Sequence, residues 1–184
     1  ETIKTTTIYF YDTDDSLKST VVYKDTTLRT AKPDAATLAT LGKQSATYYS
    51  GIKGEEKQTY SQTYAKGVVD RTTLFIYSGN QLIRSESYKD TTERVDGTLP
   101  LASALGLKKQ ISYFTGAEGE EKVDYSQEYT GSIKDSETIK TTTIYFYDTD
   151  DSLIYTVGYH RALLRSAHSY PAPRSTDRKQ SATY

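Results

Sequence analysis

Residues 1–17 read ETIKTTTIYFYDTDDSL, and the same seventeen residues recur without a single change at positions 137–153. The segment KQSATY at 43–48 also returns 136 positions later, at 179–184. A catalytic site is normally built once in a chain, whereas a structural unit is copied in tandem. The repeat therefore indicates architecture before it indicates chemistry.

A diverged copy lies between the two identical ones. YSGIKGEEK at 49–57 is echoed 65 positions later by FTGAEGEEK at 114–122, and both continue after two residues into Tyr-Ser-Gln-x-Tyr. YKDTT at 23–27 likewise matches 88–92. A period this long suggests two smaller modules in each unit. The predicted repeat units are 1–70, 71–136 (diverged) and 137–184 (incomplete).

The first module of each unit is expected to be a β-hairpin. Residues 5–11 (TTTIYFY) alternate, which predicts a strand with two distinct faces. One face carries Thr6, Ile8 and Phe10. A polar turn at 12–16 follows, and the chain returns from residue 17. The middle copy repeats this pattern at 72–77 and 82–88, around Gly79-Asn80, two residue types that tolerate positive φ.

The second module is expected to be another hairpin, with strands near 45–50 and 57–64 joined by the loop 51–56. A connector between the modules, 31–42, is either a short helix capped by Asp34 or an ordered loop. The middle copy offers a similar connector at 98–106, with an early Pro and a final Gly. In the third unit residues 169–178 contain two prolines and are not expected to be helical.

The expected fold class is all-β. Tandem β-hairpin repeats would form an elongated antiparallel sheet or solenoid, with short connector loops or helical turns. Only 35% of the residues are hydrophobic, which is little for one compact core. The chain instead contains 18 Tyr, and Tyr and Thr favour a pleated, half-buried surface.

Composition excludes several classes of protein. With no Cys there is neither a disulfide framework nor thiolate chemistry. A formal charge of −1 provides no basic surface for nucleic acid, and no apolar run is long enough for a membrane span. The absence of Met, together with a start in phase with the repeat, suggests a fragment or processed product, so the lack of a signal peptide carries no weight.

The hairpin resembles two families of bacterial repeat. Tyr9-Phe-Tyr11-Asp12-Thr-Asp-Asp15-Ser16-Leu17 matches the Tyr, Asp and Leu positions of the YD (Rhs-type) repeat, but has Asp15-Ser16 where that motif has Gly-Arg. The aromatic strand, short turn and Tyr-Lys-Asp ending are similar to MORN-like hairpin repeats. Either resemblance implies a large, secreted or surface-exposed protein built from hairpin strips, and neither implies an activity for one strip.

The acidic turns are weak candidates for a Ca²⁺ site. Carboxylates close together in sequence offer the oxygen ligands that calcium prefers. The middle copy has no Asp at this turn, however, and Asp residues also stabilise turns through their own side chains. We therefore expect no metal or other cofactor. The candidate ligands are Asp12, Asp14, Asp15, Asp148, Asp150 and Asp151.

Tyrosine rows are the second candidate site. Aromatic ladders on repeats can stack against sugar rings, or can form cross-strand pairs that stabilise the sheet. We favour the structural role. The tyrosines considered for glycan stacking are Tyr9, Tyr11, Tyr60, Tyr64, Tyr125 and Tyr129.

An enzyme is not expected. The paired carboxylates Glu55-Glu56 and Glu120-Glu121 lie on repeated polar loops, and adjacent strand residues point to opposite faces. No phosphate-binding glycine loop or nucleophile motif is present. The expected function is a structural repeat segment of an extracellular or cell-surface fibre, stalk or adhesin, which self-associates through strand edges or ends into filaments. A carbohydrate-binding module for surface glycans is the alternative, and a wall segment of a YD-repeat toxin shell is the third hypothesis.

Overall fold

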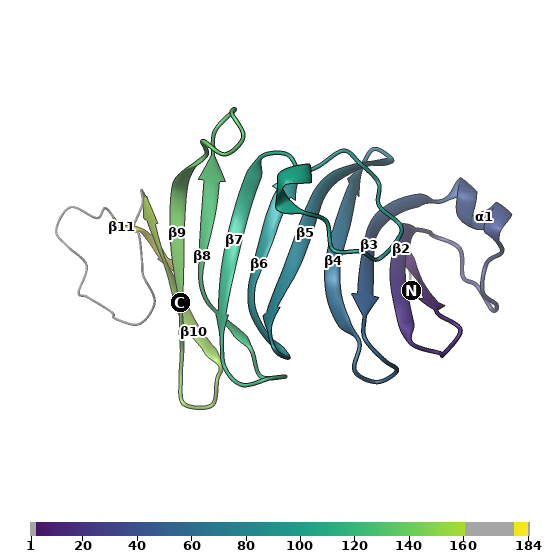
Figure 1. The fold of residues 1–184 in the computed structure, drawn as a ribbon, viewed down its shortest axis with the longest axis horizontal. Coiled ribbons are helices and arrows are strands. Elements are labelled where there is room, and N and C mark those ends of the chain that lie inside the picture. Colours follow the sequence, from purple (N-terminus) through teal and green to yellow (C-terminus); the bar gives the residue numbers. More distant parts are fainter. Residues whose placement is uncertain (1–2, 161–178, 184) are drawn as a thin grey trace. The chain divides into compact units, whose positions relative to one another are not determined.

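The computed structural model describes residues 3–160 and 179–183, and nearly all regular structure in them is β (Figure 1). Contacts divide the chain into two compact units. Unit 1 comprises residues 1–75 and 88–106, and unit 2 comprises residues 76–87 and 107–184. The all-β prediction is confirmed, while the three repeat units of the sequence remain a prediction.

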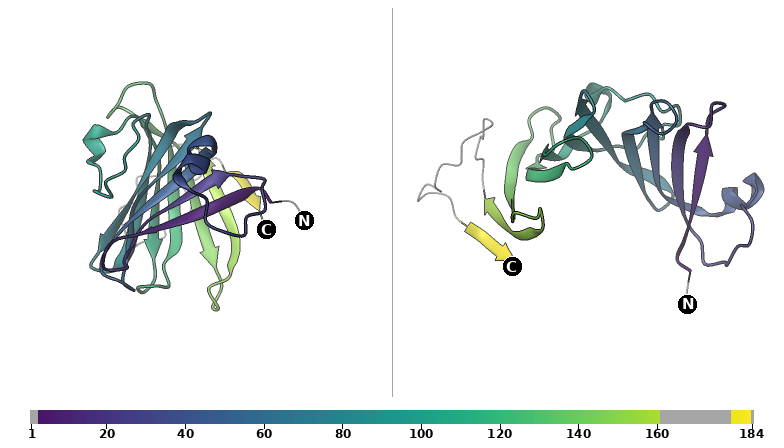
Figure 2. Two further views of the ribbon diagram at one scale, coloured as in Figure 1. Left: turned by 90° about the vertical axis from the view of Figure 1, so that its right-hand side faces the viewer. Right: turned by 90° about the horizontal axis from the view of Figure 1, so that it is seen from below.

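Unit 1 is a series of antiparallel strands that follow one another in chain order. Its elements are β1 (Thr5–Tyr11), β2 (Leu17–Lys24), α1 (Ala35–Thr40), β3 (Gly42–Ser50), β4 (Lys57–Ala65) and most of β5 (Val68–Ser78). Each strand pairs with the next, from β1 to β5. β1, drawn in purple, is the first strand of this series (Figure 2).

Unit 2 has the same plan. It contains most of β6 (Gln81–Lys89), β7 (Lys108–Thr115), β8 (Lys122–Thr130), β9 (Thr138–Tyr147), β10 (Leu153–His160) and β11 (Lys179–Thr183). From β7 to β11 each strand pairs antiparallel with its successor. The predicted hairpins are therefore confirmed in both units, including the turn at Gly79-Asn80, where Gly79 has φ of 59°.

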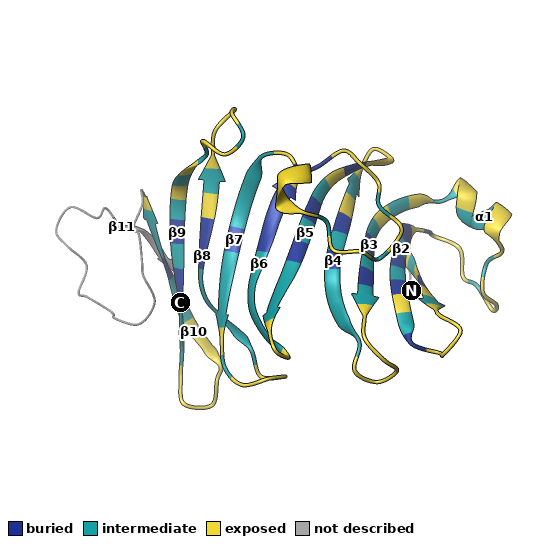
Figure 3. Ribbon diagram, viewed as in Figure 1, coloured by how far each residue is buried: buried dark blue, intermediate teal, exposed yellow. Residues whose placement is uncertain are grey.

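Burial alternates along the strands as the sequence pattern predicts (Figure 3). In β1, Ile8 is buried, while Tyr9 is exposed on the other face. In β2 the residues Ser19, Val21 and Tyr23 are buried in turn. Alternation of this kind indicates a sheet with one more deeply buried face.

Equivalent hairpins pair in the same register in the two units. Ile8 lies opposite Val21 in the β1–β2 pair, and Ile144 lies opposite Val157 in the β9–β10 pair. Tyr48 lies opposite Tyr60 in the β3–β4 pair, as Tyr113 lies opposite Tyr125 in the β7–β8 pair. Even the irregularities recur, since the pairing register shifts directly after each tyrosine pair. The copied sequence thus specifies the pairing as well as the strands.

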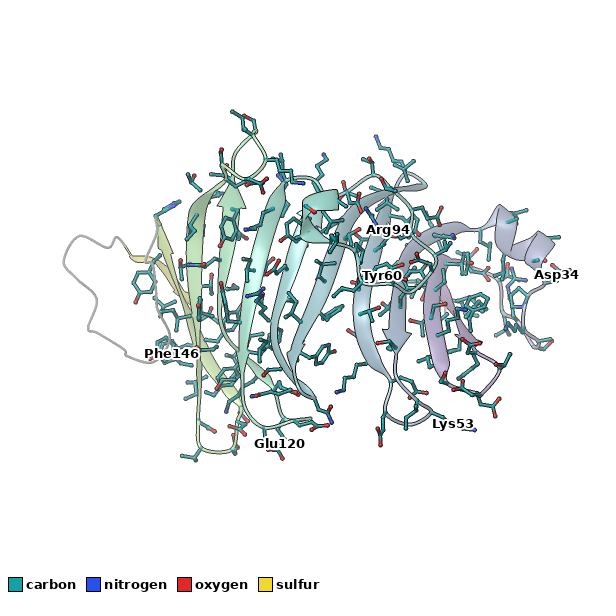
Figure 4. All side chains as sticks on the ribbon, in the orientation of Figure 1. Asp34, Lys53, Tyr60, Arg94, Glu120 and Phe146 are labelled. Atoms are coloured by element: carbon teal, nitrogen blue, oxygen red, sulfur yellow. The ribbon has the colours of Figure 1, made fainter. Side chains whose placement is uncertain are left out.

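The connectors carry the little helix that is present. α1 begins after Asp34, whose carboxylate accepts a 2.8 Å hydrogen bond from the N–H of Thr37, so the predicted cap is confirmed (Figure 4). In the middle copy the helical turn is the 3-10 helix η1 (Ala102–Ala104). Gly106 follows, with its N–H bonded to the carbonyl of Lys89, so close that a Cβ would lie 2.5 Å from that oxygen. The connector expected at 169–178 lies outside the described residues.

Candidate functional site

The acidic turns are held together by their own hydrogen bonds. Asp14 accepts bonds from the N–H and hydroxyl of Ser16, at 3.0 and 2.6 Å, and these bonds lower the pKa of Asp14. Asp15 adopts a left-handed conformation with φ of 62°. Asp12 accepts a bond from the N–H of Thr13. These are the features of an Asx-type turn.

The second acidic turn has the same organisation. Asp148 and Asp150 accept bonds from the N–H groups of Asp150 and Ser152, and Asp151 has φ of 66°. Among the described residues there is no group of three or more His, Cys, Asp or Glu side chains arranged to hold a metal ion. The expectation of no metal stays a prediction, and the geometry of the turns does not require the alternative, calcium.

Two of the tyrosines considered for glycan stacking form stacked cross-strand pairs. Tyr60 stacks on Tyr48 with ring centroids 4.6 Å apart, and Tyr125 stacks on Tyr113 at 4.4 Å. Tyr60 has no exposed surface, whereas Tyr125 is half-buried. Burial raises the pKa of Tyr48 and that of Tyr125 to about 12. These pairs contribute to the sheet, in the manner of aromatic cross-strand pairs generally.

The other four tyrosines differ in exposure. Lys43 lies over the ring of Tyr64 at 5.6 Å, and Lys108 lies over that of Tyr129 at 5.2 Å, which are cation–π contacts. Tyr9 and Tyr11 are 52% and 59% exposed. The tyrosines considered for glycan stacking therefore have unlike surroundings, and within unit 1 the exposed pair Tyr9 and Tyr11 contrasts with the buried Tyr60.

Each glutamate pair supplies a clamp between hairpins. Glu56 accepts 2.9 Å bonds from the N–H groups of Leu17 and Gly54, and Glu121 accepts the corresponding bonds from Leu82 and Gly119. The bond from Leu17 is the main cause that lowers the pKa of Glu56. The second Glu of each loop thus ties the loop to the neighbouring hairpin.

A buried polar cluster in unit 1 was not anticipated from the sequence. The Thr72 hydroxyl donates to Asp90 at 2.7 Å, and the guanidinium of Arg94 pairs with the same carboxylate. Gln62 is fully buried and its amide nitrogen donates to Thr72 Oγ1 and to the carbonyl of Thr92, at 3.0 and 2.9 Å. Its amide oxygen accepts from the N–H of Arg94. We call these residues the Gln62 cluster.

Unit 1 contains a second, simpler version of this cluster beside β1. Thr6 donates to Asp25 at 2.9 Å, Arg29 pairs with Asp25, and the N–H of Thr27 donates to it. The Arg29 guanidinium is the main cause that holds the pKa of Asp25 well below its usual range. The sequence contains a signal for both clusters. YKDTTLR at 23–29 matches YKDTTER at 88–94, and in each segment an Arg follows the Asp by four residues.

The equivalent position in unit 2 lacks the acid. Thr142 corresponds to Thr6, but the sequence continues after Tyr159 as His160-Arg161, without the Asp. Thr142 is fully buried, and among the described residues its hydroxyl has no hydrogen-bond partner. Its cross-strand neighbour is Gln127, as Gln62 is that of Thr72.

An open hollow of about 690 Å³ lies beside β1 in unit 1. One wall is formed by β1, including Thr6, Tyr9 and Tyr11, and the other by residues within 27–33, the stretch between β2 and α1 that we include in the connector from here on. Leu28 on that wall is 79% exposed. The hollow therefore combines a strand edge, exposed apolar surface, and Thr6 and Arg29, the two side chains that contact Asp25.

Comparison with known proteins shows little similarity. No family model matches the chain, and no curated protein matches it. A crystal structure of a protein of unknown function from Bacteroides fragilis NCTC 9343 aligns with 14% identity and a TM-score of 0.29, over 85% of this chain and 81% of that one. No helix among the described residues is both long enough and apolar enough to cross a membrane.

Proposed function

We propose that the chain is a structural repeat segment of an extracellular or cell-surface fibre, stalk or adhesin, and that it associates with further copies through strand edges. The repetition of one pairing pattern is the observation that supports this most. Equivalent hairpins in units 1 and 2 share their register and their glutamate clamps. Units of this kind extend by adding hairpins, and each added hairpin stabilises its neighbour.

Strand edges provide the means of association. An edge strand presents a row of unpaired N–H and C=O groups to any further strand. β1 is the first strand of unit 1 and pairs, within the described residues, with β2 alone. The proposal assigns no enzymatic activity to the chain.

Sedimentation and electron microscopy over a range of concentrations test the proposal. We expect particles that grow with concentration and lengthen in one direction. The substitution Thr7→Pro should reduce this growth, because it removes the N–H that Thr7 presents to the open edge. The carbonyl of Lys4 accepts a bond from Asp25 and so points toward the β2 side, and because backbone groups alternate in direction along a strand, the N–H of Thr7 points away from β2. Thr7→Val keeps that N–H and is the matched control. Uniform monomers at every concentration would contradict the proposal.

Carbohydrate binding is the second candidate. Tyr9 and Tyr11 favour it, because both rings are exposed and both line the hollow beside β1. A glycan array should then give signals that Tyr9→Ala and Tyr11→Ala abolish. A silent array would remove this candidate.

A further inference from the structure

Among the described residues of unit 1, one edge of β1 has no strand beside it. The N–H of Asp25 donates to the carbonyl of Lys4 at 3.3 Å, so the backbone carbonyl of Lys4 points toward the β2 side of the strand. Backbone groups alternate in direction along a strand, so those of Thr5, Thr7 and Tyr9 face away from β2. The described residues place no strand on that side.

The same sequence has a neighbour on that side in unit 2. β9 repeats β1 residue for residue, and it pairs with β8 as well as with β10. In the β8–β9 register Tyr125 lies opposite Ile144 and Gln127 lies opposite Thr142. β4 pairs with β5 in the corresponding way, with Gln62 opposite Thr72. A strand with Tyr-Ser-Gln-x-Tyr therefore lies beside this type of strand in both cases.

The hollow beside β1 contains the groups that such a glutamine contacts. Gln62 bonds to Thr72, to the carbonyl of Thr92 and to the N–H of Arg94. The residues of the simpler cluster that correspond to these three all line the hollow. They are Thr6, Thr27 and Arg29.

Tyrosine exposure gives independent support. Tyr9 and Tyr11 are exposed, whereas the identical Tyr145 and Tyr147 are half-buried beside β8. The hydroxyl of Tyr147 donates to the carbonyl of Val123 at 2.8 Å, and Lys122 lies over its ring at 4.9 Å. Because the two strands have the same sequence, the adjacent strand accounts for these contacts.

We propose that the open edge of β1 and residues 27–33 form a binding site for an extended strand of the type Tyr-Ser-Gln-x-Tyr. The strand pairs antiparallel with β1, its first Tyr opposite Ile8 and its Gln opposite Thr6. The glutamine amide inserts between Thr6 and the connector, and the second Tyr packs toward Leu28. The site rests on the proposed association through strand edges, for which it names one edge and its specificity.

Recognition by this site combines two contributions. Backbone bonds to the edge supply affinity for any extended strand, while side chains at defined register positions supply selectivity. The glutamine is the selective element because it both donates and accepts, matching a hydroxyl, a carbonyl and an N–H. An apolar residue of similar size in its place leaves those groups unpaired.

A synthetic peptide of residues 122–130 (KVDYSQEYT) tests the site directly. Fluorescence polarisation of the labelled peptide against the full chain should show saturable binding. The peptide with Gln127→Leu should bind roughly tenfold more weakly, because partners of the amide lose their bonds. Equal binding of both peptides would overturn the proposal, since it would indicate general strand pairing without the glutamine site.

Two exposed leucines provide a matched pair of protein variants. Leu28 lines the hollow and is 79% exposed, whereas Leu101 is 75% exposed and does not line it. Since neither side chain is buried, neither substitution should unfold the chain. Leu28→Asp should weaken peptide binding severalfold, and Leu101→Asp should leave it unchanged. Equal effects of the two substitutions would overturn the placement of the site.

A tethered strand covers the case in which a free peptide binds too weakly to measure. Residues 122–136 placed directly before Glu1 reproduce a native junction, because residue 136 is followed by the same seventeen residues. The tether raises the effective concentration of the strand. The midpoint of thermal unfolding should then rise above that of the unmodified chain, and less so with Gln127→Leu in the added segment.

The outcomes separate this site from the proposed function. Glutamine-dependent peptide binding by a chain that stays monomeric would support the site and contradict assembly. Assembly without any glutamine-dependent binding, free or tethered, would support assembly through another edge and overturn the site.

Discussion

The Gln62 cluster of unit 1 and the equivalent position of unit 2 show what one missing carboxylate does to a copied structure. In unit 1, Thr72 donates to Asp90 and accepts from Gln62. In unit 2, Thr142 lies in the same register beside Gln127, yet among the described residues its hydroxyl has no partner. Pairing of the strands thus persists where, among the described residues, the Thr142 hydroxyl lacks the bonds that Thr72 makes.

The tyrosine pairs differ in a parallel way. Tyr60 is completely buried, and residues 90–106 contact the strands around it through bonds such as that from Thr59 to the carbonyl of Gly97, at 3.2 Å. Tyr125 stacks just as closely on Tyr113 but is half-buried. The same cross-strand pair therefore has unequal burial in the two units, and its energetic contribution should differ accordingly.

The largest expected effect comes from the tyrosine pairs. Tyr60→Ala should lower the free energy of unfolding by about 4 kcal/mol, because it removes a fully buried ring and leaves a cavity. Tyr125→Ala should cost about 2 kcal/mol, since part of that ring is already in contact with water. Urea denaturation followed by circular dichroism measures both. The exposed Tyr9→Ala is the control, and equal losses for Tyr60 and Tyr125 would contradict the comparison.

Breaking the Gln62 cluster should have the next largest effect. Thr72→Val keeps the shape of the side chain but removes the hydroxyl between Gln62 and Asp90, so two buried partners lose a bond. We expect a loss of about 2 kcal/mol in the free energy of unfolding. Thr72→Ser retains the hydroxyl and should cost less. If valine proves no worse than serine, the cluster does not stabilise unit 1.

The same substitution in the two identical seventeen-residue copies should change stability in opposite directions. Thr142→Val should raise the free energy of unfolding by about 1 kcal/mol, because a buried hydroxyl without a partner is replaced by a methyl group. Thr6→Val should lower it by about 1 kcal/mol through loss of the bond to Asp25. Thermal unfolding of the two variants, compared with the parent chain, gives the sign directly. Changes of the same sign would refute the assigned difference.

Asp25 should make a small contribution that depends on pH. Its pKa in the folded chain is held below the unfolded value of about 4 by Arg29, then by the N–H of Thr27. The stabilisation is therefore complete above the unfolded pKa and is lost as the pH falls toward the folded pKa. The unfolding midpoint of the parent chain should fall more steeply on acidification below pH 4 than that of Asp25→Asn. Parallel curves would show that Asp25 is not stabilised by folding.

Much of the fold could be predicted from short-range pattern. Period-two alternation located the hairpins, and Asp34 with its following Ala/Leu run marked a place where a short helix was one of two alternatives. These features depend on neighbours in the sequence, so they are readable without tertiary contacts. The two short helices at the connectors were harder to foresee, because an ordered loop satisfies the same residues.

The candidate sites were less predictable. Tyr60 and Tyr64 share a face, as expected, but sequence does not reveal that Tyr60 is buried while Tyr9 is exposed. The Gln62 cluster joins residues from two strands and a connector, separated by up to 32 positions. Such contacts depend on how a connector folds back onto the sheet, which no local pattern specifies.

By itself, the sequence determined a repeated all-β chain whose copied segments form the same hairpins, because strand alternation and turn residues act over a few positions. Only the tertiary structure decided what each copy touches. Identical residues have different surroundings, as Tyr9 beside an open hollow and Tyr145 beside β8 demonstrate. The physical reason is that burial and hydrogen bonding are properties of neighbouring strands and connectors, and a residue gains these only when the chain has folded.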